Sequence, residues 1–226
     1  MIEVQNLIKN YSTGKVVTKV LQNLTFSIPS GEMVAIIGKS GAGKSTLLYQ
    51  LSLLDTPTSG SITINNIDTA TLSEKDRVAI RLSQMGYVFQ DYSLVPELTA
   101  QENVMLPLMM QGITKKEAAQ RAHTALTRVG LEKRLNYLPS QLSGGEKQRA
   151  GIARAVINNP EIIFADEPTA SLDSTNSQEV MNVLTDLHKK GQTIVMVTHE
   201  TEYANMCQRI LELEDGYIIK DTRPNQ

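Results

Sequence analysis

Short apolar runs recur along the chain, and four of them have the length and composition of buried β-strands. They lie at residues 33–37, 85–89, 161–165 and 193–198, and they are rich in Ile, Val, Met and Phe. Continuous apolar runs of this length are typical of parallel strands that are covered on both faces. The pattern therefore predicts an α/β fold with a mostly parallel sheet.

Residues 2–30 show alternating polar and apolar positions instead, which predicts antiparallel β structure. Ile2-Glu3-Val4 is expected to open one strand and Leu21–Ile28 to form another, with a turn or loop at Ser12–Lys15 between them. Ser61–Ile64 alternates in the same way and leads into a hairpin tip at Asn65 and Asn66.

A second hairpin is expected near the C-terminus. Asp215-Gly216 is a strong turn signal, and residues 210–213 and 217–219 on either side of it are apolar enough for strands. The chain from Lys220 onward is expected to be a frayed tail.

Helical patterns dominate residues 98–158, and capping residues mark where individual helices begin. The capping pairs are Ser73 with Asp76, Thr114 with Glu117, and Ser143 with Glu146, while Asp173 or Ser174 caps a later helix. Pro107 must end or kink the methionine-rich helix around Met105–Met110. That methionine-rich stretch is either core or a surface that adapts to a partner helix.

Composition narrows the class of protein. The chain has 226 residues, a net charge of −2 and one cysteine, Cys207, so no internal disulfide can form. The charge indicates no basic face for nucleic acid, and no apolar run approaches the ~20 residues of a membrane helix. With Glu3 and Lys9 interrupting any signal-peptide core, we expect a soluble protein in a reducing compartment.

The strongest chemical signal is the segment Gly38-Lys39-Ser40-Gly41-Ala42-Gly43-Lys44-Ser45-Thr46, which fits the phosphate-binding pattern G-x-x-x-x-G-K-[ST]. It lies between an expected strand and an expected helix, as that pattern requires. Glycines let successive N–H groups converge on phosphate oxygens, and the helix N-terminus adds positive potential. Lys44 is predicted to bind the β- and γ-phosphates and Ser45 to ligate Mg²⁺. The alternative is a glycine-rich turn that binds nothing.

Four further candidates follow predicted strands. Asp166 and Glu167 come at the end of their strand, where an aspartate holds Mg²⁺ and a neighbouring glutamate is a candidate general base for water. Gln90 either ligates Mg²⁺ through its side-chain carbonyl oxygen, or orients water, or is a solvated loop residue. His199 either contacts a γ-phosphate or is structural.

Two more candidates lie outside those strand ends. Tyr11 either stacks on a purine or is an ordinary strand-end tyrosine. Ser143-Gly144-Gly145-Glu146 opens a helix, and two glycines in its first turn cost helix stability. Glycine there permits the close approach of another backbone or of a phosphate; the alternative is that Ser143 and Glu146 form only a good helix start.

Taken together, these motifs resemble the nucleotide-binding subunit of ATP-binding-cassette (ABC) transporters over essentially the whole chain. Tyr11, the P-loop, Gln90, Leu142–Glu146, Asp166-Glu167, Asp173 and His199 stand in the family's order. Glu146 replaces the glutamine that is more usual at the end of the signature. The runs 87–96, 98–104 and 144–155 are similar to the clade of macrolide exporters, lipoprotein-release systems and related peptide exporters.

The resemblance implies a P-loop NTPase core with an antiparallel β subdomain in residues 1–89 and 159–226, and an inserted helical subdomain in residues 90–158. It implies ATP and Mg²⁺ as cofactors, with Ser45, Gln90 and Asp166 on the metal. Catalysis would fall to Glu167, His199, Gln90 and Lys44. ATP would be bound by Tyr11, residues 38–46, residues 143–146 and Asp173.

The resemblance also implies partners. Two copies would bind head to tail around two ATP molecules, each P-loop facing the partner's Ser143-Gly144-Gly145. The dimer would drive a separate membrane permease from the cytoplasmic face of the membrane, through the region of Gln90–Leu98 and Met105–Met110. A periplasmic or extracellular adaptor is a further partner that the clade allows.

Three other functions remain as alternatives. A related ATPase signals across the membrane to cell-wall hydrolases during division and moves no solute. DNA-repair and chromosome-structure ATPases share the fold but carry long coiled-coil insertions, and no sustained heptads occur here. A small-molecule P-loop kinase would leave Ser143 and His199 without roles.

Overall fold

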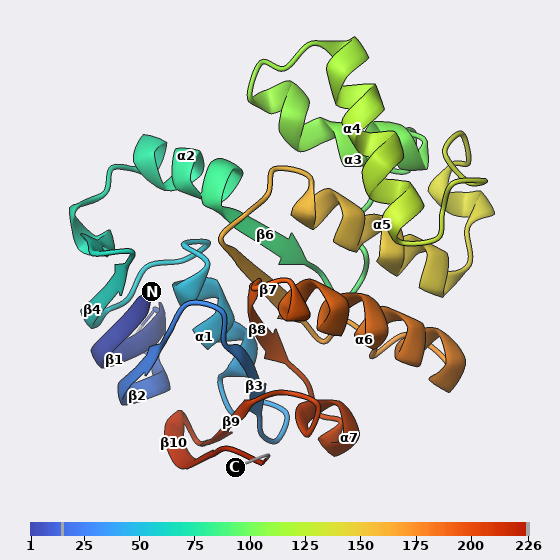
Figure 1. Cartoon of the computed structure of the whole chain (residues 1–226). Helices are drawn as coiled ribbons and strands as arrows, with labels where there is room; N and C mark the ends of the chain where they lie inside the picture. The colour runs from blue at the N-terminus through green and yellow to red at the C-terminus, as the bar shows by residue number, and fades with distance from the viewer. Residues whose placement is uncertain (15, 225–226) are drawn as a thin grey trace. The chain divides into compact units, whose positions relative to one another are not determined.

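The computed structural model describes residues 1–14 and 16–224, so Lys15 of the predicted first turn and the last two residues of the predicted tail lie outside it. The chain falls into two compact units, residues 1–79 with 191–226 and residues 80–190. Figure 1 shows their helices and strands coloured along the chain. The predicted helical insertion, residues 90–158, lies within the second unit, and its status as a separate subdomain stays a prediction.

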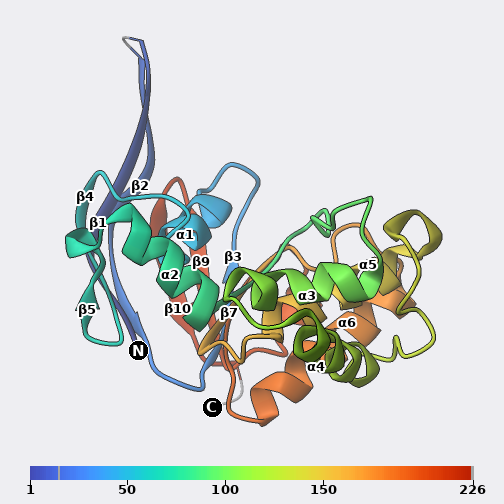
Figure 2. The same ribbon diagram turned by 90° about the horizontal axis from the view of Figure 1, so that it is seen from above.

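The first unit contains an antiparallel sheet with the strand order β2-β1-β4-β5. Its strands are β1 (Ile2–Thr13), β2 (Val16–Ile28), β4 (Ser59–Ile64) and β5 (Ile67–Asp68). Alternate residues of β1 such as Ile2 and Val4 are buried, as the sequence pattern predicts. β1 begins at Ile2 as predicted, whereas β2 begins at Val16, earlier than the predicted Leu21, and Figure 2 shows the two strands extending together as a two-stranded arm.

Parallel strands form the second sheet region of this unit. β3 (Met33–Ile37) pairs in parallel with both β8 (Thr193–Val197) and β9 (Arg209–Glu214), and β10 (Tyr217–Thr222) pairs with β9 in the opposite direction. Every residue of β8 is buried, which explains its unbroken apolar sequence. Two helices follow strands of this region: α1 (Lys44–Leu51) after β3 and α7 (Thr201–Ala204) after β8.

In the second unit, β6 (Met85–Val88) and β7 (Ile162–Asp166) pair in parallel. α3 (Ala100–Met110), α4 (Lys115–Arg128) and α5 (Gly144–Val156) contact one another, and α5 also contacts α6 (Ser174–Lys189). Their shared apolar core includes Val104, Leu108, Ala122, Leu126 and Ala153. α2 (Glu74–Gln84) precedes β6.

The predicted helix starts are confirmed by their hydrogen bonds. Ser143 and Glu146 form a reciprocal capping box at α5, and Ser73 and Asp76 exchange hydrogen bonds in the same way at the start of α2. Thr99 and Glu102 form a further capping box at α3, which was not predicted. Thr114 accepts from the Glu117 N–H at the start of α4, and Asp173 caps α6 through the Asn176 N–H. Both predicted hairpin tips are also confirmed, since Asn65, Asn66, Asp215 and Gly216 have positive φ angles.

Two expectations are narrowed or corrected. Of the two outcomes expected at Pro107, an end of the helix does not occur: α3 runs to Met110, and Val104, Met105 and Leu108 around the proline are buried in the helical core. Lys220 onward is not simply a tail, because β10 continues to Thr222 through its pairing with β9. The methionine-rich stretch is divided: Met105 is buried, while Met109 and Met110 are 43% and 69% exposed.

Within residues 1–14 and 16–224, no helix is both long enough and apolar enough to cross a membrane.

Candidate functional site

The segment between β3 and α1 folds as a tight loop that only glycines permit. Gly38, Gly41 and Gly43 have φ angles of 149°, 81° and 99°, which L side chains rarely adopt. A Cβ at Gly38 would lie 2.2 Å from the Leu213 carbonyl oxygen, and one at Gly43 would lie 2.8 Å from the Val20 carbonyl oxygen. The glycine pattern of the motif is therefore imposed by backbone shape and by close neighbouring strands.

Lys44 anchors this loop from inside. Its side chain is buried, and its Nζ donates to the carbonyl oxygens of Gly38 and Lys39 at 2.9 and 3.1 Å. Lys44 is also the first residue of α1, whose first turn contains no acidic residue. The loop therefore brings an ammonium group and the N-terminal end of a helix together, which is the chemistry that binds phosphate.

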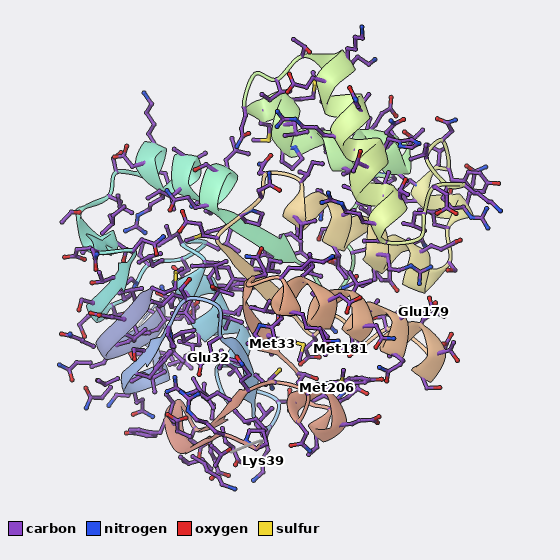
Figure 3. The ribbon with its side chains drawn as sticks, in the orientation of Figure 1. Glu32, Met33, Lys39, Glu179, Met181 and Met206 are labelled. Atoms are coloured by element: carbon purple, nitrogen blue, oxygen red, sulfur yellow. The ribbon has the colours of Figure 1, made fainter. Side chains whose placement is uncertain are left out.

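Lys39, another predicted ligand in this loop, extends outward instead. Its side chain is 86% exposed and pairs with Glu214 of β9, with 3.0 Å between Nζ and Oε1. Figure 3 labels Lys39 at the surface of the molecule. The hydrogen bond from Lys39 to Glu214 raises the pKa of the lysine.

Tyr11 lies near the end of β1 and has a defined set of partners. Its hydroxyl donates to Asp55 Oδ2 at 2.8 Å, and the other oxygen of Asp55 accepts from Lys9 Nζ at 2.8 Å. Lys9 Nζ also lies 4.7 Å from the centre of the Tyr11 ring. Tyr11 remains 42% exposed, so part of its surface is available to a flat ligand.

Burial alone would raise the pKa of Asp55, but the hydrogen bonds from Lys9 and Tyr11 outweigh burial and lower it. Asp55 is therefore ionised at neutral pH and acts as a charged anchor for the tyrosine. Burial and the hydrogen bond to Asp55 raise the pKa of Tyr11, so its hydroxyl keeps its proton and remains a donor.

His199 follows β8 at the same edge where the phosphate loop follows β3. The two strands are parallel neighbours, and Thr198 at the end of β8 donates its N–H to the Ile36 carbonyl oxygen at 3.2 Å. Thr198 also accepts from the Glu200 N–H at 3.1 Å, which fixes the backbone on both sides of His199. The histidine side chain itself is exposed.

In the second unit, Asp166 is the last residue of β7 and is buried, with its Oδ2 3.5 Å from the Tyr87 hydroxyl that donates to it. Glu167 turns the chain sharply with a φ of 44°, an unusual angle for a residue with a side chain. Gln90 follows the parallel neighbour β6 and is exposed. All three predicted strand-end residues thus lie at the carboxyl ends of one strand pair.

Among the described residues, no group of three or more His, Cys, Asp and Glu side chains could hold a metal ion. The predicted Mg²⁺ ligands are a hydroxyl, an amide and one carboxylate, which are oxygen donors of the kind that Mg²⁺ prefers. Of the three predicted ligands, only Asp166 is a His, Cys, Asp or Glu residue, so this set would not count as such a group even if it bound Mg²⁺.

The glycines at the start of α5 allow close packing within the protein. A Cβ at Gly145 would lie 1.9 Å from Asn176 Oδ1, and one at Gly144 would lie 3.1 Å from the Tyr92 hydroxyl. Asn176 is held in turn by Asp173, whose Oδ2 accepts from its side-chain amide at 2.7 Å. Asp173 accepts hydrogen bonds from the backbone N–H and from the side-chain amide of Asn176. Both bonds lower the pKa of Asp173, and the backbone bond has the larger effect. Asp173, a predicted site residue, is therefore linked to the predicted signature through Asn176.

Sequence reasoning missed the residues that shape the segment after β6. Asn103 is completely buried and donates to the carbonyl oxygens of Val95, Leu98 and Thr99, while its Oδ1 accepts from the Val95 N–H. Arg154 of α5 donates to the carbonyl oxygens of Tyr92 and Ser93. No sequence signal identifies Asn103, because the polar residues Gln101 and Glu102 directly precede it and its burial is set by tertiary packing.

Gln148 of α5 fixes the beginning of the same segment. It is buried, and its side-chain amide donates to the Phe89 carbonyl oxygen at 3.2 Å, immediately before Gln90. The next residue of α5, Arg149, pairs with Glu179 of α6, which is labelled in Figure 3. α5 therefore carries the predicted signature at its N-terminus and, through Gln148, holds the backbone of the residue before Gln90.

Comparison with known proteins places this site in a family. Residues 21–170 match the family described as ABC transporter. An ABC transporter ATP-binding protein from Methanocaldococcus jannaschii is 48% identical over 97% of this chain and 98% of its own length. The macrolide export ATP-binding/permease protein MacB of Vibrio parahaemolyticus is 45% identical, but the chain spans only 34% of that protein.

Solved structures agree with the sequence matches. A dimeric, post-hydrolysis state of the ATP-binding cassette MJ0796, bound to ADP and Pi, superposes with a TM-score of 0.93 at 41% identity and 99% coverage of both chains. CbiO1 from Clostridium perfringens, part of an ABC transporter complex, gives a TM-score of 0.87 at 30% identity, covering 99% of this chain and 88% of its own. With its phosphate loop, strand-end acids and capped signature helix, this chain belongs to the ABC transporter family as an ATP-binding subunit with an ATPase domain.

Proposed function

We propose that two copies of this chain bind head to tail around two ATP molecules and that ATP hydrolysis by this dimer drives a separate membrane permease of the export or release type. The observation that carries the proposal is the start of α5. Ser143 and two glycines stand at a capped helix N-terminus, and Ser143 is exposed. A helix N-terminus is a ready site for phosphate, and a second one supplies positive potential that the phosphate loop of the opposite copy lacks.

The relatives support this arrangement. The ATP-binding cassette that superposes over 99% of both chains is dimeric and bound to ADP and Pi. A two-fold interface would complete two such sites at once, because each copy contributes a phosphate loop to one site and a signature helix to the other.

Each predicted residue then has a role of its own. Lys44 and the N–H groups of residues 38–46 bind the phosphates, and the exposed ring of Tyr11 stacks on the base. Glu167 accepts the proton of the attacking water, while His199 and Gln90 orient that water and the γ-phosphate. Asp173 holds Asn176 against the signature and so supports the surface that the second copy meets.

Ser45, Gln90 and Asp166 would hold Mg²⁺ through oxygen atoms. When bound, Mg²⁺ neutralises the charge on the phosphates. Asp166 is suited to this task because it is a strand-end carboxylate that already accepts a hydrogen bond from Tyr87.

The permease partner is inferred from the exporter relatives. The MacB proteins are named as ATP-binding and permease proteins, and this chain matches about a third of their length. The exposed Val95, Met109 and Met110 in the segments near Gln90 and at the end of α3 fit a surface for a permease helix. We place the protein at the cytoplasmic face of the membrane through that partner, with an extracytoplasmic adaptor as an optional further component.

Substitution of Ser143 by arginine tests the proposal. Ser143→Arg puts a bulky cation into the surface that meets the second copy, and it should leave ATP binding by the monomer within about twofold while blocking dimerisation and hydrolysis. ATP binding, light scattering and phosphate release measure the three effects.

Thr114→Arg is the matched control, because Thr114 is also an exposed helix cap that accepts from a backbone N–H. It loses about the same capping energy, roughly 1 kcal/mol, without touching the signature. Full hydrolysis by Ser143→Arg would remove the reason for invoking a second copy.

A further inference from the structure

Glu146 joins the signature to a loop that the proposed mechanism does not use. Its Oε2 accepts from the Ser143 N–H at 2.8 Å, and its own N–H donates to Ser143 Oγ at 3.2 Å. Its other oxygen, Oε1, accepts from Arg134 Nε at 2.8 Å. The guanidinium of Arg134 lies 4.9 Å from the centre of the Tyr137 ring. A single carboxylate therefore holds both the helix cap and an arginine.

This carboxylate creates an electrostatic conflict. The hydrogen bond from the Ser143 N–H, with the pairing to Arg134, outweighs burial and lowers the pKa of Glu146, so it is ionised at neutral pH. An anion in the first turn of α5 uses the positive end of the helix dipole. A γ-phosphate arriving at the same helix end would meet a like charge, which weakens its binding unless that charge is neutralised.

The other cations at the start of α5 have different partners. Lys147 Nζ lies 5.8 Å from the centre of the Tyr92 ring, and Arg149 pairs with Glu179 of α6. Arg134 contacts Glu146 directly, and the hydrogen bond and charge of Glu146 raise the pKa of Arg134. Its geometry, with Nε aimed at the carboxylate and the ring of Tyr137 behind it, makes Arg134 the neutralising group.

We propose that Arg134 is a positioning residue for the signature, which neutralises Glu146 and holds it against Ser143 so that the α5 N-terminus can receive the γ-phosphate bound by a second copy. This inference rests on the proposed function of Ser143. The family more usually has a neutral glutamine at this position of the signature. The positive charge of Arg134 would explain how the negatively charged Glu146 can take its place.

A double-mutant cycle tests the inference in a Glu167→Gln background, in which ATP is bound but not cleaved. Light scattering measures the ATP concentration for half-maximal dimerisation. Arg134→Ala should raise that concentration about fivefold when Glu146 is present. Glu146→Gln keeps the acceptor for the Ser143 N–H and removes the charge, so Arg134→Ala added to Glu146→Gln should change it less than about twofold.

Arg121→Ala is the matched control, because Arg121 forms a comparable exposed ion pair with Glu117 on α4. It should leave dimerisation unchanged. The thermal midpoint of each variant without nucleotide separates a loss of folding stability from a loss of ATP-dependent assembly. If Glu146→Gln restores the dimerisation of Arg134→Ala while the thermal midpoint stays unchanged, the ion pair is not purely structural.

The outcomes separate the two proposals. If Arg134→Ala has the same effect with Glu146 and with Gln at position 146, or no effect in either case, the proposed role of Arg134 is wrong. The proposed dimer still stands in that case, provided that Ser143→Arg abolishes assembly in the same assay. If Ser143→Arg still assembles with ATP, or if the Glu167→Gln protein does not assemble at all, the proposed function fails and the inference about Arg134 fails with it.

Discussion

At Tyr11, the hydroxyl group and the ring have different partners. The hydroxyl is tied to Asp55, the Lys9 ammonium lies 4.7 Å from the ring centre, and 42% of the residue is exposed. The motif predicts a tyrosine before the phosphate loop, but its anchors are 2 and 44 positions away in the sequence. Such contacts depend on how β1 meets the end of α1, which no local pattern encodes.

We expect Tyr11→Ala to weaken ATP binding by about 1–3 kcal/mol, because it removes the aromatic surface that stacks on the base. Binding of inorganic tripolyphosphate, which has no base, should be unchanged. Lys44→Ala is the comparison variant and should weaken the binding of both, since Lys44 acts on the phosphates. Calorimetry on the purified protein measures all four affinities.

An equal loss of ATP and tripolyphosphate affinity in Tyr11→Ala would contradict a contact with the base. Unchanged affinity of Lys44→Ala for tripolyphosphate would contradict the phosphate role of the lysine, whose Nζ in this structure donates to loop carbonyl oxygens.

Among the elements, α5 combines the most constraints. It begins at a capping box, and its second residue faces Asn176 of α6. Gln148 and, in the last turn, Arg154 hold the segment after β6. The cap was predictable from Ser143 and Glu146 because it is local. The need for glycine at position 145 was predictable as an anomaly, but the neighbour that requires it was not.

Gly145→Ala should destabilise the protein by about 1–3 kcal/mol, because the added Cβ would overlap the side chain of Asn176. Gly151→Ala lies in the same helix and is the matched control. Its Cβ would meet only the Tyr92 carbonyl oxygen at 3.5 Å, an ordinary contact. This control should be neutral or stabilising by up to about 1 kcal/mol, the usual gain of alanine over glycine in a helix.

Chemical denaturation of the two variants gives the comparison directly. Equal free energies of unfolding for Gly145→Ala and Gly151→Ala would show that Asn176 moves aside without cost and that the glycine is not required for packing.

In α3, a local sequence rule does not decide where the helix ends. A proline within an apolar stretch predicts an end or a kink, and of these two outcomes the end does not occur, because the helix continues to Met110. Burial of Val104, Met105 and Leu108 in the core of α3, α4 and α5 outweighs the missing N–H of Pro107. The same burial decides which methionines are core and which are exposed, a division that the sequence left open.

For the whole molecule, buried strands and hairpin turns were predictable because apolar runs and Asn or Asp-Gly turns are local signals. The parallel pairing of β3 with both β8 and β9 was not, since those partners are about 160 and 175 residues away in the paired registers. The first part of β2, from Val16 to Val20, was also missed, because exposed polar residues such as Thr18 and Lys19 lie within it. The assignments of site residues to roles stay predictions.

In the proposed function, a complete catalytic site needs two copies of the chain. The most direct measurement is the molar mass of the Glu167→Gln protein by light scattering, with and without saturating Mg-ATP, together with the number of ATP molecules retained. We expect a monomer without nucleotide, and with Mg-ATP a dimer that retains two ATP molecules. A Glu167→Gln protein that stays monomeric at saturating Mg-ATP, while the wild-type monomer cleaves ATP at full rate, would contradict it.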